Sequence, residues 1–314
     1  MRVLYHYAAG PELERRLAEL AGSGLEVAVC GEQDDGRFTA LLPETEVIWH
    51  CLRPLDAGSL DAAPRLRLIQ KIGVGVNTID LEAARARDIA VCNLPGSNSR
   101  AVAEQTLGLM LAVLRRLPLF DALVRTGRGW DRDPGIDDGL GELAGRTVGL
   151  VGGGSVPQLL APILRAMGAR VCWTARSERP EAIGEYLPLD DLLACSDLVS
   201  LHVPLTEETR NLLDARRIAA MRPGAILINT ARGGLVDAPA LQAALESGHL
   251  AGAGLDVFAE EPPAPDDPLL ASERVVLAPH VAWLTRETLE RSLRIAVENC
   301  MRLERGETLL HRVV

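Results

Sequence analysis

Short apolar runs alternate with amphipathic helical runs along most of this 314-residue chain. Strand-like and helical segments that alternate in this way predict parallel β-sheets with helices on both faces. At roughly 150 residues for each domain, the length predicts two such lobes. The sequence is therefore of the α/β class, with two doubly wound parallel-sheet lobes. The expected strands are Val3–Tyr7, Val47–Cys51, Leu68–Ile72, Ala90–Cys92, Thr147–Val151, Arg170–Thr174, Leu198–Val203, Ala225–Asn229, Gly252–Asp256 and Val275–Leu277.

A break in the pattern separates two sets of strands. The stretch from Pro118 to Gly145 is rich in Gly, Asp and Arg. Long helical patterns flank the second set of strands, one at Arg100–Leu117 and one at Arg286–Arg305. Helices in these positions connect two lobes and return the chain to the first. We therefore expect one domain of residues 1–98 and 286–314, interrupted by a second domain of residues 99–285.

The composition narrows the classes of function. The net charge of −10 offers no basic surface for nucleic acid. The longest apolar helical run, Thr106–Leu114, is too short to cross a bilayer, and the N-terminus has no signal-peptide pattern. The six cysteines form no Cys-x-x-Cys pair, so we expect reduced core cysteines and no metal site. We expect a cytoplasmic protein whose partners include neither nucleic acid nor a membrane.

A glycine-rich turn follows one of the expected strands. Gly152, Gly153 and Gly154 come directly before an amphipathic helix, and a second strand closes the βαβ unit. The apolar face of this helix, which we expect to be buried, carries Val156, Leu159, Leu160, Ile163, Leu164 and Met167. In a dinucleotide fold the first glycine makes the tight turn, and the second lets the backbone approach the pyrophosphate at the helix N-terminus. We therefore expect Gly152, Gly154, Ser155 and Val156 to bind a dinucleotide. The alternative is a structural turn that binds no ligand.

Two prolines make this turn unusual. Pro157 stands where a third glycine normally allows close packing of helix and strand. Proline is acceptable near a helix start. Pro162 lies inside the helical pattern, where we expect it to bend the helix.

The end of the second strand of this unit selects between the two nicotinamide dinucleotides. A carboxylate there would bind the 2′-hydroxyl of NAD, but this chain has Ala175, Arg176 and Ser177. Arg176 can pair with a 2′-phosphate, so NADP is favoured over NAD. The alternative is a solvated arginine beside an NAD site.

Three polar segments each follow a strand of the second set. They place Arg232 after the strand at 225–229, Glu261 after the strand at 252–256, and His280 after the strand at 275–277. In an open α/β sheet, ligands bind at the carboxyl ends of the strands. We therefore expect these three side chains to converge on one site beside the dinucleotide.

The chemistry of this trio suits reduction of a ketone that carries a carboxylate. The Arg232 guanidinium can hold the carboxylate with two parallel hydrogen bonds. An imidazolium at His280 can give a proton to the ketone oxygen, and Glu261 beside it favours the charged ring. The alternatives are a structural histidine, an arginine that caps a strand end and a glutamate that is surface charge.

The chain resembles the D-2-hydroxyacid dehydrogenase family from about Gln70 to His311, and six segments carry the resemblance. They read KIGVGVNTID, NLPGSNSRAVAEQTLGLML, LHVPLTEETR, INTARGGLVD, GAGLDVFAEEPP and APHVAW. The resemblance implies a Rossmann dinucleotide-binding domain inserted into a flavodoxin-like substrate domain. It also implies an NAD(P)-dependent enzyme that interconverts small 2-oxo acids and D-2-hydroxy acids, of the glyoxylate, hydroxypyruvate or phosphoglycerate type. Members are commonly dimers through the nucleotide-binding lobe, so we expect a homodimer.

The resemblance also implies roles for particular residues. Arg232 would bind substrate, Glu261 would be the carboxylate partner, and His280 would be the acid/base. Backbone N–H groups of Val74 and Gly75 would hold the substrate carboxylate. Residues implied on the cofactor side are Thr106, Val203, Pro204, Thr209, Thr230, Ala231 and Asp256.

Two further residues bear on the choice of substrate. Lys71 would meet a second anionic group, such as a phosphate; the alternative is a solvated lysine at a strand end. Trp283 would narrow the site or reach a neighbouring subunit; the alternative is plain packing.

Other functions on the same fold remain open at this point. A non-enzymatic NAD(H)-sensing protein, like the corepressors built on this fold, is one alternative. A phosphite-oxidising enzyme is another. A formate enzyme is disfavoured, because those of this type carry Gln where this chain has Glu261.

Overall fold

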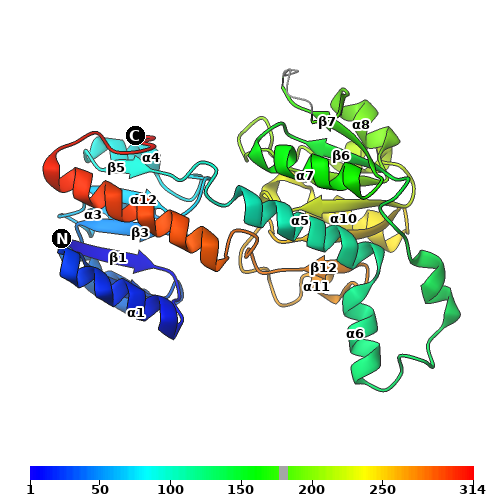
Figure 1. The fold of residues 1–314 in the computed structure, drawn as a ribbon, viewed down its shortest axis with the longest axis horizontal. Coiled ribbons are helices and arrows are strands. Elements are labelled where there is room, and N and C mark those ends of the chain that lie inside the picture. The colour runs from blue at the N-terminus through cyan, green and yellow to red at the C-terminus, as the bar shows by residue number, and fades with distance from the viewer. Residues whose placement is uncertain (177–182) are drawn as a thin grey trace. The chain divides into compact units, whose positions relative to one another are not determined.

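The computed structural model describes residues 1–176 and 183–314, which form two compact units (Figure 1). The first unit comprises Met1–Asn98 and Thr285–Val314, and the second comprises Ser99–Leu284. The sequence predicted domain boundaries at 98/99 and 285/286, and the two units meet at 98/99 and 284/285. The second unit is thus an insertion in the first.

The first unit is built on a parallel sheet of five strands within its described residues, in the order β2-β1-β3-β4-β5. Helices α2, α3 and α4 pack on one face through Phe38, Leu60 and Ala84. Helix α12 contacts β4, and α1 contacts β2. The strands are β1 (Arg2–His6), β2 (Glu26–Cys30), β3 (Val47–His50), β4 (Leu68–Lys71) and β5 (Ala90–Cys92). The helices are α1 (Pro11–Glu19), α2 (Asp35–Leu41), α3 (Ala57–Asp61), α4 (Leu81–Ala86) and α12 (Arg286–Arg305).

The second unit is built on a parallel sheet whose described strands are ordered β12-β11-β10-β9-β6-β7-β8. Helices α5 and α7 pack in one apolar cluster, and α8, α9 and α10 pack in another. Helices therefore cover both faces of the sheet and bury its strands (Figure 1). The strands are β6 (Thr147–Val151), β7 (Arg170–Thr174), β8 (Glu185–Tyr186), β9 (Leu198–Leu201), β10 (Ala225–Asn229), β11 (Leu250–Leu255) and β12 (Val275–Leu277). The helices are α5 (Ser99–Leu114), α6 (Leu117–Arg125), α7 (Ser155–Ala166), α8 (Leu189–Cys195), α9 (Ala215–Ala220), α10 (Ala238–Glu246) and α11 (Pro268–Ala271).

The two doubly wound sheets confirm the fold class, with corrections at particular elements. The alternation of apolar runs did not indicate β2 or β8. The helix expected at 100–117 ends at Leu114, because Arg116 adopts a φ of 48° and a second helix, α6, begins at Leu117. The expected break at 118–145 therefore contains a helix of its own.

Helix α7 differs from expectation in which face it buries. Pro157, Leu160, Ala161 and Leu164 are buried. Ile163 and Met167, expected on the buried face, are instead 40% and 38% exposed. The helix continues through Pro162, which lies outside the buried set. A proline on this outer face leaves the packing surface of the helix intact.

Other structural features bear on function. In the described part of the chain, no helix is long and apolar enough to cross a membrane, and no cluster of three His, Cys, Asp or Glu side chains is arranged to hold a metal ion. All six cysteines are free thiols, and all but Cys195 are buried.

A buried polar network ties α12 to the sheet of the first unit. The Asn299 side chain donates to Gln70 Oε1 at 2.7 Å and to the Leu310 carbonyl at 3.1 Å, and accepts the Leu310 N–H at 2.7 Å. Both Asn299 and Gln70 are fully buried. The network therefore joins β4, α12 and the C-terminal segment at one point.

We expect Asn299→Leu to destabilise the first unit by about 3 kcal/mol, because it leaves Gln70 and the Leu310 backbone buried without partners. Hydrogen exchange of the β4 amides should then be about a hundredfold faster. Glu304→Ala, at an exposed position of the same helix, is the matched control and should leave exchange unchanged. Equal protection in Asn299→Leu and wild type would contradict this role.

Candidate active site

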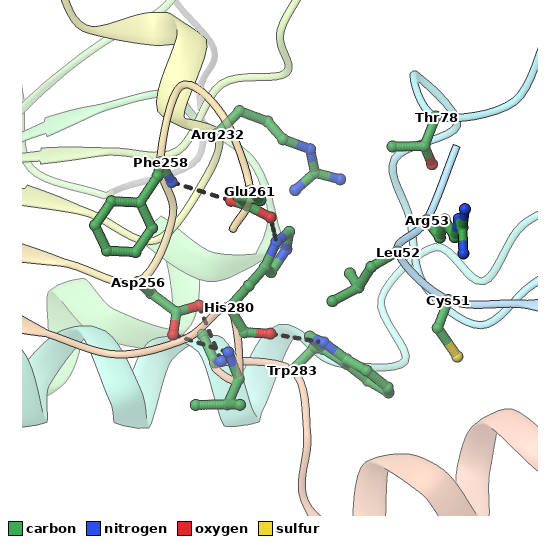
Figure 2. Close-up of polar contacts among 12 residues, drawn as sticks. Cys51, Leu52, Arg53, Thr78, Arg232, Asp256, Phe258, Glu261, His280 and Trp283 are labelled. Carbon is green, nitrogen blue, oxygen red and sulfur yellow. Dashed lines mark hydrogen bonds and ion pairs between the residues drawn. The ribbon is translucent and has the colours of Figure 1, made fainter. Parts of the chain in front are cut away.

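The three expected catalytic side chains come from the carboxyl ends of three adjacent strands. Arg232 follows β10, Glu261 follows β11, and His280 follows β12, and the sheet places these strands side by side in the order β12-β11-β10. Figure 2 shows the three side chains close together. Parallel strands bring their carboxyl ends to one edge, which explains how residues far apart in the sequence form one cluster.

A short hydrogen bond joins His280 to Glu261. The imidazole Nδ1 lies 2.6 Å from Glu261 Oε2, and Glu261 Oε1 accepts the backbone N–H of Phe258 at 3.0 Å. Both carboxylate oxygens are therefore engaged, which fixes the direction of the carboxylate. Within the described residues the imidazole Nε2 has no partner, so it is the nitrogen available to a substrate.

The backbone around His280 is held at both of its polar groups. Its N–H donates to the Asp256 carbonyl at 2.7 Å, and its own carbonyl accepts the Trp283 indole N–H at 3.0 Å. His280 has a φ of 54°, a left-handed conformation that costs energy for a non-glycine residue. The buried Trp283 thus helps to hold a strained residue in its own chain.

Asp256 anchors the loop that carries His280. Its two carboxylate oxygens accept the backbone N–H groups of Val281 at 2.9 Å and Ala282 at 3.0 Å, and the residue is 1% exposed. Burial raises the pKa of the Asp256 carboxyl above its usual value, although the two N–H groups and the charge of His280 oppose the shift. Loop anchoring is a function of Asp256 that the sequence did not indicate.

Asn229 holds the loop that carries Arg232. Its side chain accepts the Ala231 N–H at 3.0 Å and donates to the Arg232 carbonyl at 2.9 Å. Its backbone carbonyl accepts the N–H of Asp256 at 3.0 Å. Asn229 was not among the residues expected from the sequence; an asparagine at the end of an apolar strand was the available signal.

The loops after β10 and β11 touch at Gly233. A Cβ atom on Gly233 would lie 1.9 Å from the carbonyl carbon of Phe258 and 2.4 Å from the backbone nitrogen of Ala259. Only glycine allows this approach. Gly233 directly follows Arg232, and the Phe258 N–H donates to the Glu261 carboxylate. The contact between the two loops therefore sets the spacing of the Arg232 and Glu261 side chains.

Burial and charge shape the protonation of this cluster. Burial raises the pKa of Glu261, but the hydrogen bond and charge of His280, the Phe258 N–H and the Arg232 charge outweigh it, and the pKa lies below its usual value. Burial lowers the pKa of the Arg232 guanidinium, and the Glu261 carboxylate opposes that shift. The arrangement therefore favours an ionised Glu261.

The glycine-rich turn fits a dinucleotide. Gly152 has a φ of 125°, and a Cβ there would lie 2.4 Å from the His202 carbonyl oxygen. Gly154 precedes the first turn of α7, and a Cβ on it would meet nothing within 4 Å. The N–H groups of Ser155 and Val156 open the helix, whereas Pro157 has none to offer. The turn thus combines an open approach with a helix N-terminus, as a pyrophosphate requires.

Several residues expected on the cofactor side have their hydroxyl groups engaged within the protein. The Thr106 and Thr230 hydroxyls lie 2.9 Å apart, and Thr106 also donates to the Val102 carbonyl at 2.7 Å. Thr209 donates to the Pro204 carbonyl at 2.7 Å, within the turn that follows Val203. These hydroxyls therefore make their hydrogen bonds within the protein.

At the end of β7, Arg176 is exposed. The Ala175 carbonyl accepts the Tyr186 hydroxyl at 3.1 Å. Ser177, also expected to bind cofactor, lies outside the described residues.

Comparison with known proteins supports the same interpretation. Residues 107–282 match the family model "D-isomer specific 2-hydroxyacid dehydrogenase, NAD binding domain". A glyoxylate reductase of Korarchaeum cryptofilum is 42% identical over 81% of this chain and 78% of its own. A D-3-phosphoglycerate dehydrogenase of Mycobacterium tuberculosis is 39% identical over 86% of this chain, but the match spans only 51% of that protein.

A solved structure, the TT0316 protein of Thermus thermophilus, superposes over the full length of both chains with a TM-score of 0.89 and 40% identity. The chain belongs to the D-isomer specific 2-hydroxyacid dehydrogenase family. As a member of this family, it is an oxidoreductase with a domain that binds NAD(P).

The first unit of this family member holds the other residues expected to contact substrate. Lys71 ends β4 and is 4% exposed, so the alternative of a solvated lysine at a strand end is wrong. Val74 is 42% exposed in the loop that follows, and Gly75 is half-buried.

We expect Gly233→Ala to lower kcat/KM for a 2-oxo acid by at least about a hundredfold, because the Phe258 backbone must move and take Glu261 with it. Gly234→Ala is the matched control. A Cβ there would lie 3.1 Å from Leu205 Cδ2, a side-chain end that can move. Steady-state kinetics of both variants, with circular dichroism to confirm folding, make the test. Similar activity of the two variants would contradict the role of this contact.

Proposed function

We propose that this chain reduces a short 2-oxo acid to the D-2-hydroxy acid with NAD(P)H, and catalyses the reverse oxidation. The observation that carries the proposal is the Glu261–His280 hydrogen bond beside Arg232, at the carboxyl edge of the sheet that bears the glycine-rich turn. Glyoxylate reductases among the relatives support a small substrate. The second unit is then the nucleotide-binding domain, and the first is the substrate domain.

Each polar group has one task in this proposal. The Arg232 guanidinium binds the substrate carboxylate and orients the neighbouring ketone. His280 donates a proton from Nε2 to the ketone oxygen, and Glu261 stabilises the charged imidazole through Nδ1. In the oxidative direction, neutral His280 accepts the hydroxyl proton. When bound, the nicotinamide supplies or accepts the hydride at the carbon between these groups.

The cofactor would rest on the turn described above. Gly152, Gly154 and the first N–H groups of α7 would receive the pyrophosphate. Asp256, with its pKa raised by burial, would face the nicotinamide carboxamide while it holds the His280 loop.

We expect His280→Ala to lower kcat for glyoxylate or hydroxypyruvate reduction by at least about a hundredfold, with little change in cofactor affinity. Glu261→Gln keeps a hydrogen-bond acceptor but removes the charge that favours the imidazolium. Its kcat for reduction should therefore be lower than that of wild type. Absorbance at 340 nm, followed from pH 5 to pH 9, measures both effects.

The same assay separates the proposal from its alternatives. Full activity of His280→Ala or of Glu261→Gln would contradict the assigned roles. Cofactor binding without turnover of any 2-oxo acid would favour the NAD(H)-sensing alternative, and turnover of phosphite alone would favour the phosphite enzyme.

We further propose that NADP is preferred to NAD. Ala175 leaves the end of β7 without a carboxylate that would repel a 2′-phosphate, and the exposed Arg176 supplies a positive charge. The Glu208 carboxylate also interacts with the positive charge of Arg176. The hydrogen bond from Thr206 is the main cause of its lowered pKa, and Arg176 contributes a smaller part.

We expect Arg176→Ala to raise KM for NADPH by about tenfold and to leave KM for NADH nearly unchanged, because only NADPH carries the 2′-phosphate. Arg216→Ala, an exposed arginine that pairs with Asp190, is the control and should change neither value. Equal KM changes for both cofactors, or a wild-type preference for NADH, would contradict the proposal.

We also propose that the protein is a homodimer through the second unit. Helix α6 buries none of its residues, and Leu117, Val124 and Trp130 are 54%, 51% and 86% exposed. The segment projects from the rest of this unit (Figure 1). Large exposed apolar side chains within one short segment favour an interaction surface, and a second copy can bury the same segment on both subunits.

We expect wild type to be dimeric by light scattering. The double variant Val124→Asp/Trp130→Glu should be monomeric, because each substitution would bury an unpaired charge at the interface. Arg125→Glu, an exposed polar change on the same helix, is the control. A monomeric wild type would contradict the homodimer, and a dimeric double variant would contradict this surface.

A further inference from the structure

Lys71 is a buried cation in the first unit, and its ammonium group is surrounded by acceptors. Its Nζ lies 3.3 Å from His50 Nδ1 and 3.3 Å from Thr78 Oγ1, and it donates to the Cys51 carbonyl. The residue ends β4, and His50 ends the neighbouring strand β3. An ammonium has three N–H donors, and three acceptors are therefore present for them.

The orientation of these groups is set by the backbone. His50 Nε2 lies 2.5 Å from the Arg53 carbonyl oxygen, which can only accept a hydrogen bond. Nε2 therefore carries the ring proton, and the lone pair of Nδ1 faces Lys71. Burial and then the charge of Lys71 hold the pKa of His50 well below its ordinary value, so the ring is a neutral acceptor.

These contacts fix both ends of the loop at residues 72–78. The Ile72 N–H donates to the His50 carbonyl at 2.8 Å, and the Thr78 carbonyl accepts the Leu55 N–H at 2.8 Å. Lys71 directly precedes the loop and donates to Thr78 at its far end, so it joins the two ends; it also donates to the Cys51 carbonyl, in the segment after β3.

The middle of the same loop is held by its carbonyl groups. The Gly73 carbonyl accepts the Leu94 N–H at 2.8 Å, and the Val74 carbonyl accepts the Asn93 side chain at 2.8 Å. In the described part of the chain, the N–H groups of Val74 and Gly75 have no acceptor. A fixed loop with consecutive unused N–H groups is an anion-binding arrangement.

We infer that Lys71 is a positioning residue for this loop and that the substrate is a short 2-oxo acid with one carboxylate, not a phosphorylated one. The inference rests on the proposed function and names its substrate class. The Val74 and Gly75 N–H groups bind the carboxylate, and Lys71 holds the loop in the conformation that presents them.

The energetics favour this assignment over binding of a second anion by Lys71. If the ammonium turned to a phosphate, the Cys51 carbonyl, His50 Nδ1 and Thr78 hydroxyl would lose a charged donor in a buried place. Each unsatisfied buried group costs about 1–3 kcal/mol. The geometry of this chain therefore favours a different substrate class from the one named for the D-3-phosphoglycerate dehydrogenases among its relatives.

The experiment compares glyoxylate, hydroxypyruvate and the phosphate ester of hydroxypyruvate on wild type, Lys71→Met and Thr78→Val. Wild type should show at least about tenfold higher kcat/KM for hydroxypyruvate than for its phosphate ester. Lys71→Met should raise KM for all three substrates by a similar factor of about ten or more, because the loop shifts for every carboxylate. Thr78→Val keeps the charge and removes one acceptor, so it should raise the same KM values by a smaller factor.

Two controls separate positioning from general damage. KM for the cofactor should stay unchanged in both variants, and Arg65→Ala, an exposed residue of the first unit that pairs with Glu44, should behave as wild type. If Lys71→Met does not fold, the KM values of Thr78→Val and the preference of wild type for hydroxypyruvate over its phosphate ester still test the inference.

A wild-type preference for the phosphate ester, or a loss confined to that ester in Lys71→Met, would overturn the inference and leave the proposed function standing. Failure of wild type to reduce any 2-oxo acid would overturn both.

Discussion

The 2.6 Å hydrogen bond between His280 Nδ1 and Glu261 Oε2 is the interaction on which the site depends. It directs the imidazole through Nδ1, so that Nε2 is left without a partner among the described residues, and it places a carboxylate beside the ring. Neither residue lies in a helix or strand, so the bond exists only because both loops are held. Asp256 and Trp283 hold the His280 loop, and the Phe258 N–H holds the Glu261 carboxylate.

The loops are held by backbone contacts as much as by side chains. Gly233 lets the loop after β10 approach the backbone of Phe258, which ties the position of Arg232 to that of Glu261. Asn229 joins the same two loops through its side chain and its carbonyl group. The strained φ of His280 is therefore supported by neighbours whose own positions are fixed. Such support is what a site needs when its geometry must not relax.

Buried polar groups organise the first unit in the same way. Lys71 satisfies three acceptors around the loop at 72–78, and Asn299 joins β4 to the C-terminal segment. A lysine and an asparagine are normally surface residues, and their burial here is stable because every polar atom named has a partner. The two networks act at different places on one strand: the Asn299 network joins β4 to the C-terminal segment, and the Lys71 network holds the loop at 72–78.

The sequence by itself determined the two sheets and the trio of Arg232, Glu261 and His280, because apolar alternation and strand-end position are local patterns. It also determined the glycine-rich turn, since a left-handed φ at Gly152 is encoded by the residue type. Only the tertiary structure decided which face of α7 is buried, that Lys71 is enclosed, and that Asn229 and Gly233 set the spacing of the trio. These depend on backbone segments from different strands meeting in space, and no periodicity along the chain reports which atoms will meet.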